Sequence, residues 1–233
     1  MKRLLACCLA LAPMPGVVAQ VPVATLGDDD LLAYLGNMRL EARLDADVTG
    51  DRIDDVVYVA SNGHERAMGV IDGSGPTARI GARSIGEGSL EPSPQVPVVL
   101  EFAEGILTVE DLTGTQGTDS VTLSRYQYRH DPGGNRMRLF TLACEQYSPT
   151  LSHGSRRLSW NLESGDHVVE HGQVVTLDTG EDVYVYESAQ RSNRHTAAVY
   201  MEDAPRPSDL VLGGASPRKR LAADGVPSVE PGP

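Results

Sequence analysis

Apolar and polar residues alternate along short stretches of this chain, and turns containing Gly, Asp and Pro separate the stretches. The clearest case is 120–129, where Val121, Leu123, Tyr126 and Tyr128 stand among polar residues. Alternation of this kind is typical of a β-strand with one buried face. Strands that follow one another through short turns favour antiparallel pairing.

A second kind of stretch is apolar on consecutive residues. Residues 55–60 read Asp-Val-Val-Tyr-Val-Ala, which predicts a strand buried on both faces. Residues 86–97 are rich in Gly, Pro and Ser and are expected to form a loop. The full set of expected strands is 55–60, 67–71, 77–84, 98–102, 106–111, 120–129, 137–144, 157–161, 167–169, 173–177 and 182–186.

Three acidic residues, Asp28, Asp29 and Asp30, precede an apolar stretch and predict a short helix over 29–38. The sequence therefore predicts a mainly β protein, with antiparallel sheets built from successive hairpins, a short N-terminal helix and a disordered C-terminal tail rich in Pro. We expect a signal peptide at 1–19, an N-terminal helical segment at 20–43, a β domain at 44–187 and an extended or disordered tail at 188–233.

The first residues have the pattern of a secretory signal. Lys2 and Arg3 form a charged start, 4–12 are apolar, and Val17-Val18-Ala19 resembles a cleavage site. Cleavage after Ala19 predicts a periplasmic or extracellular protein. The apolar stretch is too short to cross a bilayer, so we expect no membrane span.

Charge and cysteine content narrow the choice of partners. The formal net charge of −12 argues against nucleic acid or an anionic membrane as partner. Removal of Cys7 and Cys8 with the signal leaves Cys144 alone, so the mature chain has no intramolecular disulfide. Cys144 follows an apolar run and is expected to be a buried structural thiol. We expect a monomer, for which an unknown protein partner is possible.

An acidic loop precedes the strand at 55–60. Five aspartates fall within 45–55, and like charges this close repel unless a cation or solvent relieves them. Calcium takes carboxylate and carbonyl oxygens as ligands. The spacing predicts a calcium site with Asp47, Thr49, Asp51 and Asp55 as side-chain ligands. The fifth ligand is the carbonyl oxygen of Ile53.

The pattern Asp-x-Thr-Gly-Asp-x-x-Asp-Asp-Val-Val at 47–57 resembles the calcium loops of secreted FG-GAP and VCBS repeat proteins, in which the loop leads into a strand. The resemblance extends over about 44–172 and implies a β-rich fold. Thr49 departs from the usual Asn or Asp. Arg52 stands where the family has Gly, and must adopt a left-handed conformation. The alternative is a solvated acidic turn in which Arg52 pairs with an aspartate.

His167-Val-Val-Glu170-His171 matches the H-x-x-E-H pattern of zinc proteases. That pattern binds zinc when it lies on a helix, because residues four apart on a helix are close together on one face. The valines and flanking glycines indicate a strand, on which residues four apart lie about 13 Å from each other. A zinc-dependent hydrolase using His167, Glu170 and His171 is therefore the least favoured interpretation.

These observations predict a non-catalytic secreted or periplasmic β module that binds one calcium ion structurally. The sequence offers no catalytic residues for an enzyme, and its cellular role is not indicated. The alternative is an accessory or inhibitor protein that binds a partner through a sheet edge or a loop.

Overall fold

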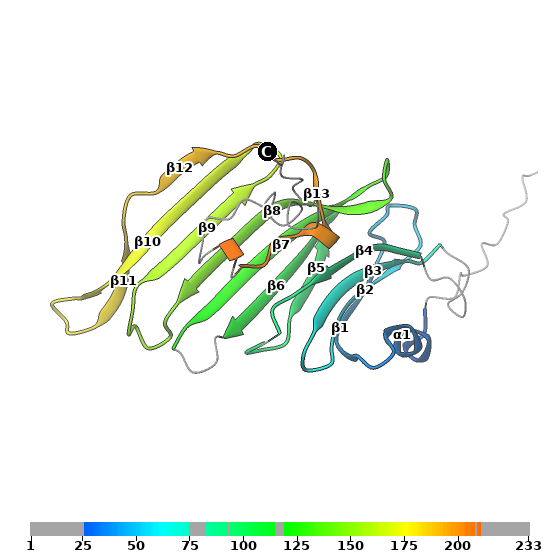
Figure 1. Cartoon of the computed structure of the whole chain (residues 1–233), viewed down its shortest axis with the longest axis horizontal. Helices are drawn as coiled ribbons and strands as arrows, with labels where there is room; N and C mark the ends of the chain where they lie inside the picture. The colour runs from blue at the N-terminus through cyan, green and yellow to red at the C-terminus, as the bar shows by residue number, and fades with distance from the viewer. Residues whose placement is uncertain (1–25, 75–82, 93, 115–118, 208, 211–233) are drawn as a thin grey trace, which may run out of the picture.

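Two antiparallel sheets and one short helix form the body of the protein (Figure 1). The computed structural model describes residues 26–74, 83–92, 94–114, 119–207 and 209–210. The predicted mainly β architecture, with antiparallel sheets of successive hairpins and a short N-terminal helix, is confirmed. The predicted signal peptide and residues 211–233 of the predicted tail lie outside the described residues.

The smaller sheet has four strands in chain order, β1-β2-β3-β4. They are β1 (Arg39–Ala46), β2 (Asp55–Ser61), β3 (Arg66–Asp72) and β4 (Arg83–Ser89). Strand β2 is buried on both faces, as predicted. Val57 and Val59 pack into the main core, whereas Val56, Tyr58 and Ala60 pack with the helix α1 (Asp28–Leu35).

The larger sheet has nine strands, seven of which follow the order β11-β10-β9-β8-β7-β6-β5. The short strand β12 pairs with β10, and β13 pairs with β8. A 3-10 helix, η1 (Met201–Asp203), follows β13. The strands are β5 (Val99–Ala103), β6 (Ile106–Gly114), β7 (Val121–Asp131), β8 (Arg136–Tyr147), β9 (Ser155–Asn161), β10 (Asp166–Thr176), β11 (Asp182–Tyr186), β12 (Gln190–Asn193) and β13 (Val199–Tyr200).

The N-terminal boundaries differ from the prediction. The helix ends at Leu35 rather than residue 38, because Gly36 adopts φ 64 and donates its N–H to the carbonyl of Leu32. Strand β1 begins at Arg39, so residues 39–43 are extended rather than helical. The acidic and basic side chains of β1 masked its pairing with β2, which runs from Arg39 opposite Ser61 to Ala46 opposite Asp55.

Two glycine-containing segments are strands where a loop or break was expected. Strand β4 runs through Gly86 and Gly88, and a Cβ at Gly88 would lie 2.7 Å from the carbonyl oxygen of Met201. Strand β10 continues through Gly172, where a Cβ would lie 2.2 Å from Ser155 Oγ. At these two positions the lack of a side chain lets a neighbouring segment of the protein approach the strand closely, so the glycines do not mark turns.

The chain beyond residue 187 also differs from the expected tail. Strand β12 lengthens the large sheet, and Val199, Met201 and Leu210 are buried in the main core. In Figure 1 this C-terminal segment crosses in front of the middle strands of the large sheet. The described part of the segment is therefore a component of the core.

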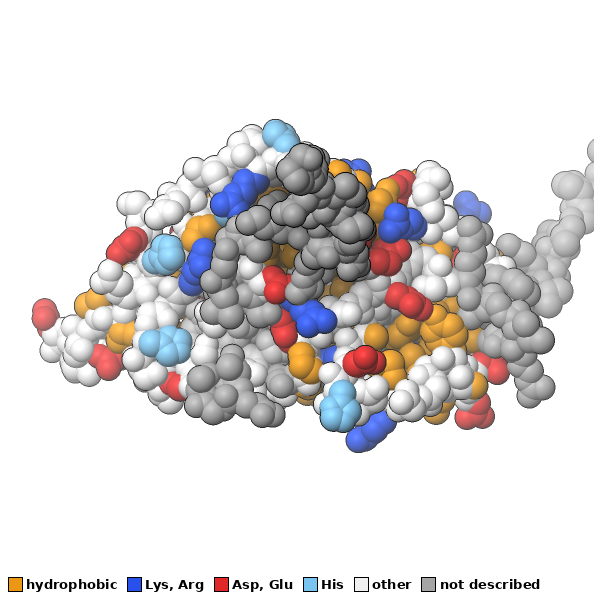
Figure 2. Space-filling model, in the orientation of Figure 1, with side chains coloured by type: hydrophobic (Ala, Val, Ile, Leu, Met, Phe, Trp, Pro, Cys, Tyr) orange, Lys and Arg blue, Asp and Glu red, His pale blue; other side chains and the backbone are white. Residues whose placement is uncertain are grey.

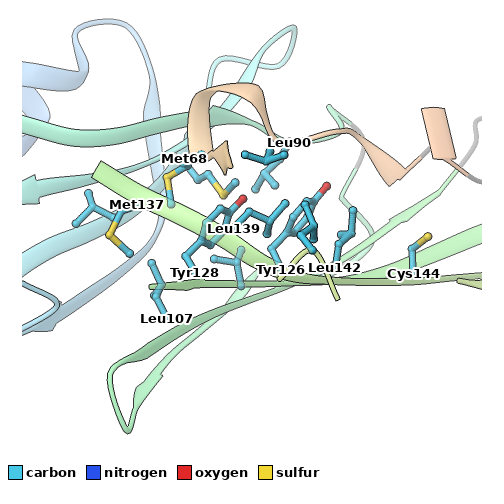
Figure 3. Packing of buried hydrophobic residues seen from close by; sticks show 14 of the residues in the cluster. Met68, Leu90, Leu107, Tyr126, Tyr128, Met137, Leu139, Leu142 and Cys144 are labelled. Carbon is cyan, nitrogen blue, oxygen red and sulfur yellow. The ribbon is translucent and has the colours of Figure 1, made fainter. Parts of the chain in front are cut away.

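The main core lies between the two sheets and under the C-terminal segment. Figure 3 shows Leu107 of β6, Tyr126 and Tyr128 of β7, and Leu139 and Leu142 of β8 projecting into one packed layer. The rings of Tyr126 and Tyr128 are stacked, with centroids 6.2 Å apart. We call the face of the large sheet that carries these side chains the inner face, and the opposite one the outer face.

A buried ion network joins the two sheets. Arg66 of β3 donates from Nε to Glu41 of β1 at 2.7 Å, and from Nη1 to Asp111 of β6 at 2.7 Å. The side chains of Arg66 and Asp111 are 0% and 2% exposed. Burial raises the pKa of Asp111, and the hydrogen bond from Arg66 opposes that rise. Removal of Asp111 leaves the buried Arg66 guanidinium with only part of its compensation.

In the part of the chain that the structure describes, no helix has both the length and the apolar character needed to cross a membrane.

We expect Asp111→Ala to lower the free energy of unfolding by about 3–5 kcal/mol, because the Arg66 guanidinium stays buried with only part of its compensation. Urea unfolding measures the change. The matched control is Glu163→Ala, which removes an exposed ion pair with Arg129 at 3.6 Å and should cost less than about 1 kcal/mol. Equal, small losses in the two variants would contradict a structural role for the network.

Candidate functional site

The acidic loop connects β1 to β2 and turns sharply at two residues. Gly50 has φ 82 and Arg52 has φ 73, so Arg52 adopts the left-handed conformation that the resemblance requires. Arg52 forms no ion pair with any residue described here, which differs from the expected pairing in an acidic turn. The counter-ion of Asp45 is instead Arg43, at 2.8 Å, and Arg43 also contacts Asp28 at 2.6 Å.

Asp55 is fully buried at the start of β2 and accepts three backbone hydrogen bonds. Its Oδ2 accepts from the N–H groups of Val48 and Thr49, at 2.8 and 2.9 Å. Its Oδ1 accepts from Gly73 N–H, at 2.9 Å. Burial raises the pKa of Asp55, and these backbone donors lower it. The carboxylate thus fastens the acidic loop to the turn that follows β3.

The other predicted carboxylate ligands also bond backbone groups of the loop. Asp47 accepts from Gly50 N–H at 2.7 Å through Oδ1 and from Arg52 N–H at 2.9 Å through Oδ2. Asp51 Oδ1 accepts from Ile53 N–H at 2.8 Å. These contacts satisfy donors that the tight turns would otherwise leave unpaired.

The carboxylates of the acidic loop contact backbone N–H groups in this structure. Among 26–74 and the other described ranges, no three His, Cys, Asp or Glu side chains are arranged to hold a metal ion. Thr49 Oγ1 is buried without a hydrogen bond of normal geometry, although it lies close enough to Asp55 to lower the pKa of that carboxyl. The predicted calcium site, with Asp47, Thr49, Asp51, Ile53 and Asp55 as its ligands, therefore stays a prediction.

The H-x-x-E-H stretch lies on β10, as expected, and its members face opposite ways. In the register of β10 with β9, His167 lies opposite Trp160 on the inner face, whereas Glu170 lies opposite Arg157 on the outer face. His167 is buried, with Nδ1 3.2 Å from Ser192 Oγ and its ring 5.8 Å from that of Trp160. Burial lowers the pKa of His167. Because residues of odd and even position on a strand face opposite sides, the structure does not bring Glu170 together with His167 and His171.

The thiol of Cys144 is buried in the main core, as predicted. Burial raises its pKa to about 12, so it is protonated at neutral pH and a poor nucleophile.

Ser152 and His153 are adjacent in sequence but do not form a nucleophile–base pair. Ser152 Oγ donates to Asp119 at 2.9 Å, together with the hydroxyls of Ser148 and Thr150. The His153 ring contacts the carbonyl oxygens of Gly154 and Asp119, at 2.7 and 3.0 Å. The hydroxyl donors lower the pKa of Asp119 to about 2. These hydrogen bonds connect the turn at 148–152 to Asp119, and none of them joins Ser152 to the His153 ring.

A groove on the outer face of the large sheet is the feature that sequence reasoning missed. It has a volume of about 400 Å³ and runs across strands β6 to β10. Two cross-strand rows line it. One row is Glu110, Arg125, Ala143, Ser159 and Val168, and the other includes Leu123, Glu145, Arg157 and Glu170.

The floor of the groove is aliphatic and its margins are charged. Leu123, Ala143 and Val168 supply the floor, and Leu123 is 41% exposed. Arg125 donates to Glu110 at 2.5 Å. Arg157 lies 3.0 Å from Glu145 and stacks 3.7 Å above the ring centroid of Tyr186.

Glu170 is the one carboxylate of the groove for which the described residues provide no counter-ion or hydrogen-bond donor. Alternation along 120–129 and 137–144 indicated which side chains face outward. It did not indicate which of them become neighbours across four strand pairs.

The opposite, inner side of the molecule is seen in Figure 2. Acidic, basic and polar side chains are mixed on this view, and hydrophobic side chains gather toward the end that carries the four-stranded sheet.

No family model, curated protein or solved structure matches this chain.

We expect Asp55→Ala to destabilise the protein by about 3 kcal/mol, because three backbone N–H groups lose their acceptor in a buried site. Thermal and urea unfolding measure the loss. The matched control is Asp54→Ala at the neighbouring exposed position, with an expected change within about 0.5 kcal/mol. If the two variants are equally stable, the carboxylate of Asp55 does not fasten the loop.

The calcium prediction is tested separately by titration. If the sequence pattern is a calcium loop, millimolar calcium raises the melting temperature and Asp51→Asn removes most of the rise. A melting temperature that calcium and chelator leave unchanged would contradict the prediction. The acidic loop would then be a turn closed by its own carboxylates.

Proposed function

We propose that the protein is a non-catalytic, exported binding module whose ligand is a small amphiphile that combines an aliphatic chain with a positively charged group. The observation that carries the proposal is the outer-face groove, in which Glu170 stands beside an aliphatic floor. Pockets of about 300–1,000 Å³ are the usual size for small ligands.

The aliphatic floor supports an apolar ligand segment. Leu123 of β7, Ala143 of β8 and Val168 of β10 all line the groove, and Ser159 of β9 lies between Ala143 and Val168 in their row. Ala143 is the smallest of them and lies in the middle of its row, where it leaves space above the sheet. Burial of an alkyl chain there would contribute about 0.8 kcal/mol for each methylene removed from water.

The charges of the groove support a cationic ligand group. Arg125 and Arg157 already pair with Glu110 and Glu145, so the carboxylate of Glu170 is left over. The chain as a whole carries a formal charge of −12, which favours approach of a cation at low ionic strength.

The non-catalytic part of the proposal rests on three observations. The thiol of Cys144 has a pKa of about 12, the two histidines of H-x-x-E-H face away from Glu170, and His153 contacts only carbonyl oxygens. None of these groups provides an activated nucleophile. Export is supported by the signal pattern at 1–19.

We expect octylammonium to bind wild-type protein and octanoate to bind at least about tenfold more weakly, because the free carboxylate attracts one head group and repels the other. Glu170→Gln should weaken octylammonium binding about fivefold, which corresponds to an interaction of about 1 kcal/mol at a partly exposed site. Ala143→Leu should block the floor and abolish binding. Isothermal titration calorimetry measures all three.

The matched control is Glu163→Gln, which changes an exposed glutamate outside the groove and should leave binding unchanged. Equal binding of octanoate and octylammonium, or unaltered binding in both Glu170→Gln and Ala143→Leu, would refute the proposed site.

A further inference from the structure

A second cavity lies on the inner face of the same strands and is enclosed by cationic and aromatic side chains. Its volume is about 130 Å³. Strands β9, β10 and β12, which lie side by side in Figure 1, supply most of its wall. The lining residues are Arg156, Leu158, Trp160, His167, Val169, His171, Gln190, Arg194 and Leu210.

The floor of this inner-face cavity consists of buried side chains. Trp160, His167 and Leu210 are 3%, 3% and 5% exposed. Trp160 Nε1 donates to the carbonyl oxygen of Arg194 at 3.1 Å, which fixes the segment after β12 over the floor. Exposed side chains of His171, Gln190 and Arg194 form the mouth, so a solute can enter from solvent.

The charged side chains that line the cavity are basic. Two arginines and two histidines line it, and no aspartate or glutamate does. The nearby carboxylate of Asp166 lies 3.9 Å from Arg191, outside the lining. The guanidinium of Arg194 forms no ion pair within 119–207 or the other described ranges. In a chain with a net charge of −12, two arginine side chains at one cavity favour the approach of an anion there.

The buried histidine adds a hydrogen-bonding group and no charge of its own. Burial, with Arg194 and Arg156 nearby, lowers the pKa of His167, so its ring is neutral near pH 7. Its Nδ1 lies 3.2 Å from Ser192 Oγ, and the residue lines the cavity.

We propose that this cavity binds a small oxyanion, the phosphate or carboxylate group of a ligand, through Arg194 and Arg156, with His167 and Gln190 completing the hydrogen bonds. Guanidinium groups present paired N–H donors that match the geometry of both oxyanions. A volume of about 130 Å³ holds one such group with little space beyond it, which selects a small anion or the head of a larger one. The site is independent of the outer-face groove, because it opens on the other face of the sheet.

The experiment is calorimetric titration of the full chain with inorganic phosphate and, in a second arm, with acetate, at constant ionic strength set with chloride. We expect saturable binding of at least one of them. Arg194→Gln should weaken that binding about tenfold, since it removes a charge-assisted pair at the mouth without changing the core. The two arms show whether the tetrahedral or the planar oxyanion is preferred.

The matched control is Arg191→Gln, three residues away on β12, which pairs with Asp166 and does not line the cavity. It should bind the anion as wild type does. Arg156→Gln provides a second test, read together with its melting temperature. Absence of saturable binding in both arms, or equal effects of Arg194→Gln and Arg191→Gln, would overturn the proposal.

Discussion

The buried guanidinium of Arg66 is the constraint on which the arrangement of the two sheets depends. A charge without solvent requires partners at fixed positions, and those partners are Glu41 on β1 and Asp111 on β6. Apolar contacts between Met68, Leu107 and Tyr128 would tolerate small displacements of one sheet over the other. The ion network does not, because a shift of one residue would bury three unpaired charges. Hydrophobic burial holds the sheets together, and the network specifies where they meet.

The large sheet separates two kinds of chemistry by the alternation of its strands. On the inner face, the row Val109, Tyr126, Leu142, Trp160 and His167 passes from core to cavity. One residue away, the row from Glu110 to Val168 forms the outer-face groove. The hydrogen-bonded strands place the outer-face groove and most of the inner-face cavity, to which the segment after β12 adds Arg194.

Much of the fold could be predicted because its signal is local. The consecutive apolar residues of β2 and the turn at Gly165 between β9 and β10 are visible in short windows of sequence. The partners of Arg66 are 25 and 45 residues distant, and nothing near Arg66 indicates them. The acidic loop shows the same limit. The spacing of Asp47 and Asp55 predicts that their oxygens bind one cation. In the structure Asp47 accepts a hydrogen bond from Gly50 N–H, and Asp55 accepts one from Gly73 N–H.

Strand β10 contributes Glu170 to the outer-face groove and His167 to the inner-face cavity. Both sites therefore depend on the same alternation of side chains between the two faces of this strand. An insertion or deletion of a single residue before Glu170 would exchange the faces of every side chain that follows, and would damage both surfaces at once. A point substitution leaves the alternation intact and so affects only the surface that the substituted side chain faces. Length variation in descendants of this protein should therefore be confined to the hairpin turns, while the number of residues between the turns that bound β10 stays constant.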